Sequence, residues 1–252
     1  MAVRNLGKQL LCAVLDLVYP PHCVACGTSL HEEELPDAFF CASCLARLQF
    51  VGPNRCPKCG HELAEYAAVH VRCPSCEGKP LFFKSATAPF KYEGAPKVLI
   101  LEFKLSRQVF LAGPLSKYLI AHLESAEFMP LIDAVIAVPL HWRRLLKRGY
   151  NQSQILADNV SQRFGRPLLT RCLCRTAPTP SQTSVSREKR MQHLRGVFAV
   201  RRPEMTRGKT LLLIDDVLTT GATCAECSRV LTQNGQAKAV YVATVARAML
   251  QK

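Results

Sequence analysis

The pattern of apolar and polar positions divides the chain into short buried strands that alternate with helices. The clearest strand covers residues 211–214, where four consecutive aliphatic side chains end at Asp215 and Asp216. A run this short and this apolar is typical of a parallel strand that is buried on both faces. Residues 224–231 then follow the helical period, and Gly235 marks the expected helix end. The pattern therefore predicts a strand, a tight loop and a helix N-terminus in this part of the chain.

Further segments repeat the alternation of strand and helix. Strands are predicted at residues 85–92, 133–138 and 197–200, and helices at residues 96–124, broken near Gly113 and Pro114, and at residues 155–164. Such alternation indicates a doubly wound parallel sheet, in which ligands bind beyond the carboxyl ends of the strands. We therefore expect an α/β fold with its site in the segments that follow the strands at 133–138 and 211–214.

Residues 1–20 imitate an export signal, because Arg4 and Lys8 precede an apolar segment. Asp16 interrupts that segment, and no small-residue cleavage site follows it. Its apolar positions follow the helical period, so we expect an amphipathic helix packed on the protein itself, with a membrane-surface anchor as the alternative. No apolar run reaches membrane-spanning length. The sequence therefore predicts a cytoplasmic protein without a membrane span.

Eight of the 13 cysteines form four CxxC pairs, which are Cys23/Cys26, Cys41/Cys44, Cys56/Cys59 and Cys73/Cys76. Two thiolates three residues apart can bind one tetrahedral metal ion, so the pairs predict two Cys₄ zinc sites. We prefer a sequential pairing, first with second and third with fourth, although the spacing also allows a crossed one. A disulfide framework would need an oxidising compartment, and redox-active CxxC motifs occur singly, so both alternatives are disfavoured.

The charge of the 252-residue chain, +14 overall, is unevenly distributed. Residues 1–80 contain seven basic and eight acidic residues, whereas residues 81–252 contain 26 and 11. We therefore expect two domains, an N-terminal helix with a double zinc-binding module over residues 1–80 and an α/β domain over residues 81–252. Four thiolates on Zn²⁺ carry a net charge of −2, so the first domain suits a scaffold or partner-docking role better than direct contact with DNA.

Small and hydroxylated residues follow the two aspartates, namely Thr219, Thr220, Gly221, Ala222 and Thr223. The backbone N–H groups of such a turn, together with the positive end of the helix dipole, suit one phosphate monoester. Asp215 and Asp216 would repel a phosphate, so they are expected to bind vicinal hydroxyls or a divalent cation. This combination predicts a 5-phosphoribosyl ligand. The rival Walker A loop is excluded because the chain lacks its sequence.

Four basic residues follow the strand at 133–138, namely Arg143, Arg144, Lys147 and Arg148. Arginine forks donate paired hydrogen bonds to phosphate oxygens, so we predict a pyrophosphate-binding loop here, with a solvated basic surface as the alternative. Trp142, the only tryptophan, either stacks on a base or covers the core, and the second role is favoured.

Residues 171–195 are rich in Thr, Pro, Ser, Gln and Arg and poor in apolar side chains. Such a stretch is either a disordered insert or a lid, and we expect a lid that arches over the site. The remaining paired cysteines lack a second pair at zinc spacing and are expected to be buried apolar thiols, namely Cys172, Cys174, Cys224 and Cys227.

Residues 214–223, IDDVLTTGAT, resemble the phosphoribosyl pyrophosphate (PRPP) motif of type I phosphoribosyltransferases. With VPLHWRRLLKRGYNQS, TPSQTSVSREKRMQHLRGVF and the paired CxxC units, the chain from Pro20 onward is similar to the ComF (competence protein F) family of predicted phosphoribosyltransferases. The family typically shows an Arg, two residues and an Asn before its RGxF segment. Here Arg190 is followed at that spacing by His193, whose role is open.

The resemblance implies a type I phosphoribosyltransferase-like fold, PRPP with Mg²⁺ as ligand, and a role in DNA uptake for natural transformation. Asp215 and Asp216 would hold the diol, residues 219–223 would seat the 5-phosphate, and the arginines would neutralise the pyrophosphate, namely Arg143, Arg144, Arg148 and Arg190. The catalytic set would be Asp215, Asp216 and Arg148.

The partners of such a protein follow from the same resemblance. The zinc module would dock a competence or helicase protein, and the acceptor of the phosphoribosyl group is open. The alternative function is a non-catalytic PRPP sensor that binds single-stranded DNA weakly and without sequence preference.

Overall fold

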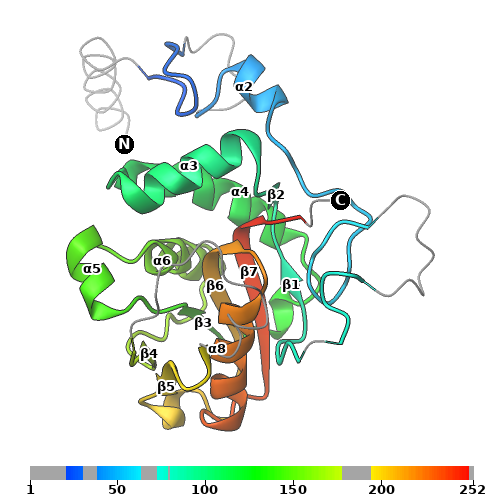
Figure 1. Cartoon of the computed structure of the whole chain (residues 1–252), viewed down its shortest axis with the longest axis vertical. Helices are drawn as coiled ribbons and strands as arrows, with labels where there is room; N and C mark the ends of the chain where they lie inside the picture. The colour runs from blue at the N-terminus through cyan, green and yellow to red at the C-terminus, as the bar shows by residue number, and fades with distance from the viewer. Residues whose placement is uncertain (1–20, 31–38, 64–72, 79, 178–193, 250–252) are drawn as a thin grey trace, which may run out of the picture. The chain divides into compact units, whose positions relative to one another are not determined.

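The computed structural model describes residues 21–30, 39–63, 73–78, 80–177 and 194–249 (Figure 1). The helix predicted for residues 1–20, as well as Arg190 and His193, lies outside these ranges. By compactness the chain divides into two units, Met1–Leu48 and Gln49–Lys252. The domain boundary predicted between residues 80 and 81 stays a prediction. The third and fourth CxxC pairs, Cys56/Cys59 and Cys73/Cys76, belong to the same compact unit as the sheet.

A parallel sheet forms the centre of the larger unit, with the strand order β1-β7-β6-β3. These strands are β1 Ala86–Thr87, β3 Ala134–Ala137, β6 Thr210–Leu218 and β7 Ala239–Arg247. A further strand, β2 Phe90–Lys91, also pairs with β7, and every pairing in this sheet is parallel. The sheet confirms the predicted α/β class, a doubly wound fold like that of type I phosphoribosyltransferases.

Helices cover both faces of this sheet (Figure 1). Two of them, α4 Ala112–Glu124 and α6 Gln152–Phe164, pack on each other and on the strands, and α8 Ala222–Gln233 covers the opposite face. The helix α3 Gly94–Leu105 lies at the carboxyl end of the sheet. The remaining helical segments are α2 Ala42–Ala46, α5 Trp142–Arg148 and the 3₁₀ turns Val109–Leu111, Met129–Leu131 and Pro203–Met205.

Three predicted boundaries were wrong. The strand expected at residues 85–92 is interrupted at Pro89, which lacks the N–H that a sheet ladder needs. The break in the predicted helical segment falls at residues 106–108 and not near Pro114. Pro114 lies in the first turn of α4, where its missing N–H costs no hydrogen bond, so it does not interrupt that helix. The strand β6 continues past its two aspartates to Leu218, because its pairing with β7 extends to that residue.

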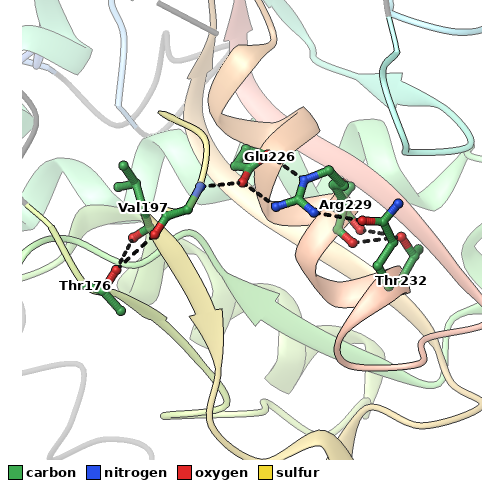
Figure 2. Close-up of polar contacts among 8 residues, drawn as sticks. Thr176, Val197, Glu226, Arg229 and Thr232 are labelled. Atoms are coloured by element: carbon green, nitrogen blue, oxygen red, sulfur yellow. Dashed lines mark hydrogen bonds and ion pairs between the residues drawn. The ribbon is translucent and has the colours of Figure 1, made fainter. Parts of the chain in front are cut away.

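The predicted strand at residues 197–200 exists but belongs to a separate sheet. There β5 Phe198–Val200 pairs antiparallel with β4 Leu173–Arg175. Most of the predicted lid, residues 178–193, lies outside the described residues. The segments on either side of it, residues 173–177 and 194–200, are joined to each other. Thr176 Oγ1 donates to the carbonyl of Val197 at 3.1 Å (Figure 2).

The segment at residues 194–200 is attached to α8 through Glu226, whose carboxylate accepts a hydrogen bond from the N–H of Gly196 at 3.1 Å. Arg229 holds that carboxylate from the other side, with Nε and Nη2 at 2.8 and 2.7 Å from its two oxygens (Figure 2). These contacts lower the pKa of Glu226, although burial alone would raise it. The position of this segment is therefore determined by a charged hydrogen-bond network on α8.

None of the described helices is long and apolar enough to cross a membrane.

Candidate functional site

The two aspartates of β6 lie beside the first turn of α6. Ser153 Oγ donates to Asp215 Oδ1 at 2.8 Å, and Gln152 Nε2 donates to Asp216 Oδ2 at 2.8 Å. Asn151 caps the helix by accepting a hydrogen bond from the N–H of Ser153, which fixes this turn. The predicted acid pair is therefore brought together with polar residues that follow the neighbouring strand β3.

Asp216 is engaged by the protein itself. It is only 4% exposed, and Lys104 Nζ from the last turn of α3 lies 2.8 Å from its carboxylate oxygens. Burial alone would lower the pKa of Lys104, but the Asp216 carboxylate raises it above its ordinary value. This ion pair, between the buried Asp216 and the partly exposed Lys104, holds α3 against the carboxyl end of the sheet, and removing Lys104 would leave an uncompensated buried carboxylate.

Asp215 has the more perturbed environment. Burial and the adjacent Asp216 carboxylate raise its pKa to about 7, while Lys104 and the hydrogen bonds to its Oδ1 oppose that rise. Both hydrogen bonds that described residues make to this side chain, from Ser153 Oγ and from the N–H of Asp216, go to Oδ1. The second oxygen, Oδ2, is thus left for a ligand hydroxyl or a cation.

The turn after β6 adopts the expected conformation. Gly221 has φ +79° and precedes the first residue of α8, and Thr220 Oγ1 accepts a hydrogen bond from the N–H of Ala222 at 3.3 Å. A left-handed residue at this point favours glycine, because a side chain there would strain the backbone. Thr219, Ala222 and Thr223 complete the predicted cradle at the N-terminus of a 12-residue helix.

The predicted pyrophosphate loop is a short helix, which corrects the sequence interpretation. His141 accepts a hydrogen bond from the N–H of Arg143, and Gly149, with φ +87°, ends α5. Burial and the neighbouring arginines lower the pKa of His141. Trp142 is 58% exposed, so the expectation that it covers the core was wrong. The Arg143 guanidinium lies over its ring, 5.2 Å from the centroid.

Arg148 is a member of this basic group whose charge interacts with that of Asp216. Its Nη1 is buried and has no hydrogen-bond partner among the residues that the structure describes. Burial lowers the pKa of Arg148, and Asp216 opposes that shift. An unsatisfied buried guanidinium N–H is a donor suited to an anionic ligand.

Four residues that contribute to this environment were not predicted, namely Lys104, Gln152, Ser153 and Arg175. Burial and the nearby Arg144 lower the pKa of Arg175, and Asp215 opposes part of that shift. This β4 residue therefore belongs to the same electrostatic environment. Gln152 is the last residue of the predicted loop and Ser153 directly follows it, so both could have been found by extending the polar run. Lys104 and Arg175 carry no local signal, because only the fold brings α3 and β4 to the site.

Two further sites are formed by the cysteines. Their Sγ atoms gather in two groups, each within 4.8 Å, which are Cys23, Cys26, Cys41, Cys44 and Cys56, Cys59, Cys73, Cys76. This is the sequential pairing that we preferred. The Sγ atoms of Cys56 and Cys76, and those of Cys59 and Cys73, are 3.7 Å apart.

These distances fit a metal ion. Four sulfurs bound at about 2.3 Å around Zn²⁺ stand about 3.8 Å from one another, whereas disulfide sulfurs are about 2.05 Å apart. Both groups therefore have the donor set and spacing of tetrahedral zinc sites, and zinc would supply folding energy to these small modules. Cys172, Cys224 and Cys227 are buried outside the groups, as predicted, and Cys174 is partly buried.

Comparisons with known proteins agree with this architecture. The model of the family described as Double zinc ribbon domain matches residues 14–77. The chain is 30% identical over 200 residues to the DNA utilization protein YhgH of Escherichia coli O157:H7, covering 78% of this chain and 86% of that protein. It is 29% identical over 218 residues to Competence protein F of Haemophilus influenzae, covering 84% and 91%. Competence protein ComFC of Bacillus subtilis is 24% identical over 220 residues, with coverage of 84% and 85%.

The fold and the cysteine groups define the class, an α/β protein with a type I phosphoribosyltransferase-like sheet and a double zinc ribbon. Within that class, the chain belongs to the ComF family, whose members carry names that refer to competence and DNA utilization.

Purified protein should contain two equivalents of zinc, and Cys26→Ser should remove one of them without unfolding the sheet. Cys59→Ser should also remove one equivalent but should lower the melting temperature of the larger unit, because its cluster is part of that core. Cys174→Ser, outside both groups, is the matched control and should retain both ions. Metal analysis of protein prepared under reducing conditions checks this, and zinc-free protein would contradict it.

Asp215→Asn should stabilise the protein at alkaline pH. The folded-state pKa of about 7 lies above the ordinary carboxyl value, so the ionised form opposes folding above pH 7, and the wild type gains stability as the pH falls from 7 towards 4. The free energy of unfolding of the variant should therefore exceed that of wild type by about 1–3 kcal/mol at pH 8. At pH 6 this difference should be smaller by about 1 kcal/mol.

Urea unfolding at both pH values measures the difference, in a range that avoids acid displacement of zinc. A gain that does not vary with pH would contradict the assigned environment of Asp215.

Proposed function

We propose that this protein binds PRPP with Mg²⁺ and acts as a phosphoribosyltransferase in DNA uptake, in the cytoplasm. The observation that carries the proposal is the acid pair of β6, which lies five residues before a left-handed glycine, Gly221, and the N-terminus of α8. Diol-binding acids and a phosphate-binding turn thus follow one another on one continuous strand–turn–helix segment. The names of the relatives support the biological context, since they refer to competence and to DNA utilization.

The two aspartates have different roles in this proposal. Asp216 is held by Lys104 and Gln152 and keeps the site in shape, whereas Asp215 offers Oδ2 to the ribose hydroxyls or to Mg²⁺. The N–H groups of the turn at residues 219–223 and the helix dipole bind the 5-phosphate. Arg148 provides its unsatisfied Nη1 for the pyrophosphate.

The reaction needs no nucleophile from the protein. The bond between ribose C1 and the pyrophosphate oxygen breaks, the electron pair leaves with pyrophosphate, and positive charge develops on the ribose ring until the acceptor attacks C1. Fixed charges that neutralise the leaving group and orient the sugar lower this barrier. Mg²⁺ would neutralise part of the pyrophosphate charge.

Asp215→Asn should lose PRPP binding and activity even though its fold is retained. With Mg²⁺ and PRPP at 100 times the Kd, wild-type protein should gain about 2.7 kcal/mol of stability. The variant should show little gain, and pyrophosphate release with an acceptor panel should fall by about 100-fold or more.

Asp158→Asn changes an exposed carboxylate on α6 and is the matched control, expected to behave as wild type. Wild-type protein that is not stabilised by millimolar PRPP would overturn the proposal.

A second candidate function, binding of single-stranded DNA, is favoured by the surface of α5. None of the seven residues of α5 is buried. Leu146 is 73% exposed and Trp142 is 58% exposed, and the guanidinium of Arg143 lies over the Trp142 ring. Aromatic side chains on which bases stack, surrounded by cations that contact the backbone, are typical of sites for single strands. The larger unit also carries most of the excess positive charge.

Trp142→Ala should weaken single-strand binding by about 1–3 kcal/mol if bases stack on the indole. Arg143→Gln together with Arg144→Gln should instead reduce the salt dependence, by a log–log slope of about 0.7 for each lost phosphate contact. Fluorescence anisotropy of a labelled oligonucleotide at several salt concentrations separates the two effects. Leu105→Ala, an exposed apolar residue outside α5, serves as control. Binding unaffected by all three α5 substitutions would exclude α5 as the surface.

A further inference from the structure

Arg247, the last residue of β7, is a charged side chain in the core. It is 2% exposed, and no carboxylate pairs with it among the described residues. A guanidinium remains ionised under all ordinary conditions, and a buried charge needs either an opposite charge or hydrogen bonds to every donor. The neighbours of Arg247 therefore have to compensate its charge.

One set of these neighbours is the turn that precedes the phosphate cradle. Arg247 Nη1 donates to the carbonyls of Leu218 and Thr219, at 3.0 and 2.6 Å, and to that of Ala248. These carbonyls orient the peptide planes directly before Thr220 and Gly221. The guanidinium thus fixes the backbone from which the N–H groups of the cradle project.

The other set of neighbours belongs to the second cysteine cluster, Cys56, Cys59, Cys73 and Cys76. Arg247 Nε donates to the carbonyl of Cys59 at 3.0 Å, and Nη2 donates to Ser75 Oγ and lies 4.0 Å from Cys59 Sγ. Zinc bound by four thiolates would carry a net charge of −2 beside the guanidinium. The loaded cluster is therefore the counter-charge that Arg247 otherwise lacks.

The cluster is also attached rigidly to the sheet. The N–H of Ala86 in β1 donates to the carbonyl of Lys58 at 3.1 Å, and a Cβ on Gly60 would stand 2.7 Å from the carbonyl oxygen of Ala86. The equivalent Gly27 of the first cluster has no atom within 4 Å of such a Cβ. The close approach at Gly60 leaves little room for the second cluster to move independently of β1.

We propose that Arg247 is a positioning residue that couples the metal in the second cysteine cluster to the phosphate-binding turn. The part of this proposal that concerns PRPP rests on the function proposed above. Coupling between two sites is reciprocal, so zinc at the second cluster raises affinity for PRPP, and PRPP slows the loss of that zinc.

The test uses the full chain with Arg247→Met, and Leu119→Ala as a control that opens a cavity in the fully buried part of α4. Hydrogen exchange of residues 218–224 is measured before and after a chelator removes zinc. In wild type, zinc removal should speed exchange selectively in this turn. Arg247→Met should show fast exchange in the turn while zinc is still bound, and Leu119→Ala should not. Exchange that rises equally across the whole sheet in Arg247→Met would overturn the proposal, because the residue would then be merely structural.

A second measurement follows zinc release to a chromogenic chelator, in a Cys41→Ser background that leaves only the second cluster loaded. PRPP with Mg²⁺ should slow release by about fivefold or more, the lower range of allosteric couplings, and Arg247→Met should abolish the effect. If PRPP binds wild type without slowing release, the coupling is wrong. If PRPP does not bind wild type at all, the proposed function fails, and the exchange experiment, which needs no ligand, still decides the role of Arg247.

Discussion

Two adjacent carboxylates inside a buried strand are the constraint around which this molecule is arranged. Isolated carboxylates in such a position would be strongly destabilising, so neighbouring elements have to compensate them. Lys104 neutralises Asp216 from α3, and α6 supplies hydrogen bonds to both side chains through Gln152 and Ser153. Because these partners come from α3 and α6, their ion pair and hydrogen bonds with the two aspartates hold both helices at the carboxyl end of the sheet.

Compensation is unequal between the two acids, and this inequality suits a binding site. Asp216 has a cation and an amide, whereas Asp215 has a hydroxyl and a backbone N–H on one oxygen and a pKa raised to about 7. A ligand hydroxyl or a cation that approached Asp215 would relieve a cost that the folded protein already carries. Perturbed acids of this kind cluster at functional sites because their environment is arranged for a ligand.

The second cysteine cluster has a role that spacing alone did not suggest. Its residues Cys56, Cys59 and Cys73 belong to the same apolar core as the strands, and Arg247 joins it to the turn after β6. The cluster therefore belongs to the architecture that supports the site. The first cluster forms part of the other compact unit, Met1–Leu48.

The sequence by itself determined the local features of this protein. The aliphatic run before Asp215, the turn around Gly221 and the CxxC spacing each depend on contacts within a few residues, so strand, turn, helix start and metal-ligand sets were predictable. Only the tertiary structure decided that Lys104 pairs with Asp216 and that Trp142 is exposed on a helix. It also decided that Arg247 connects a cysteine cluster to the turn after β6. Those contacts join residues that are far apart in the chain, such as Cys59 and Arg247. The pattern of apolar positions predicts which segments are buried, but it does not predict which distant charged or polar groups meet once those segments pack together.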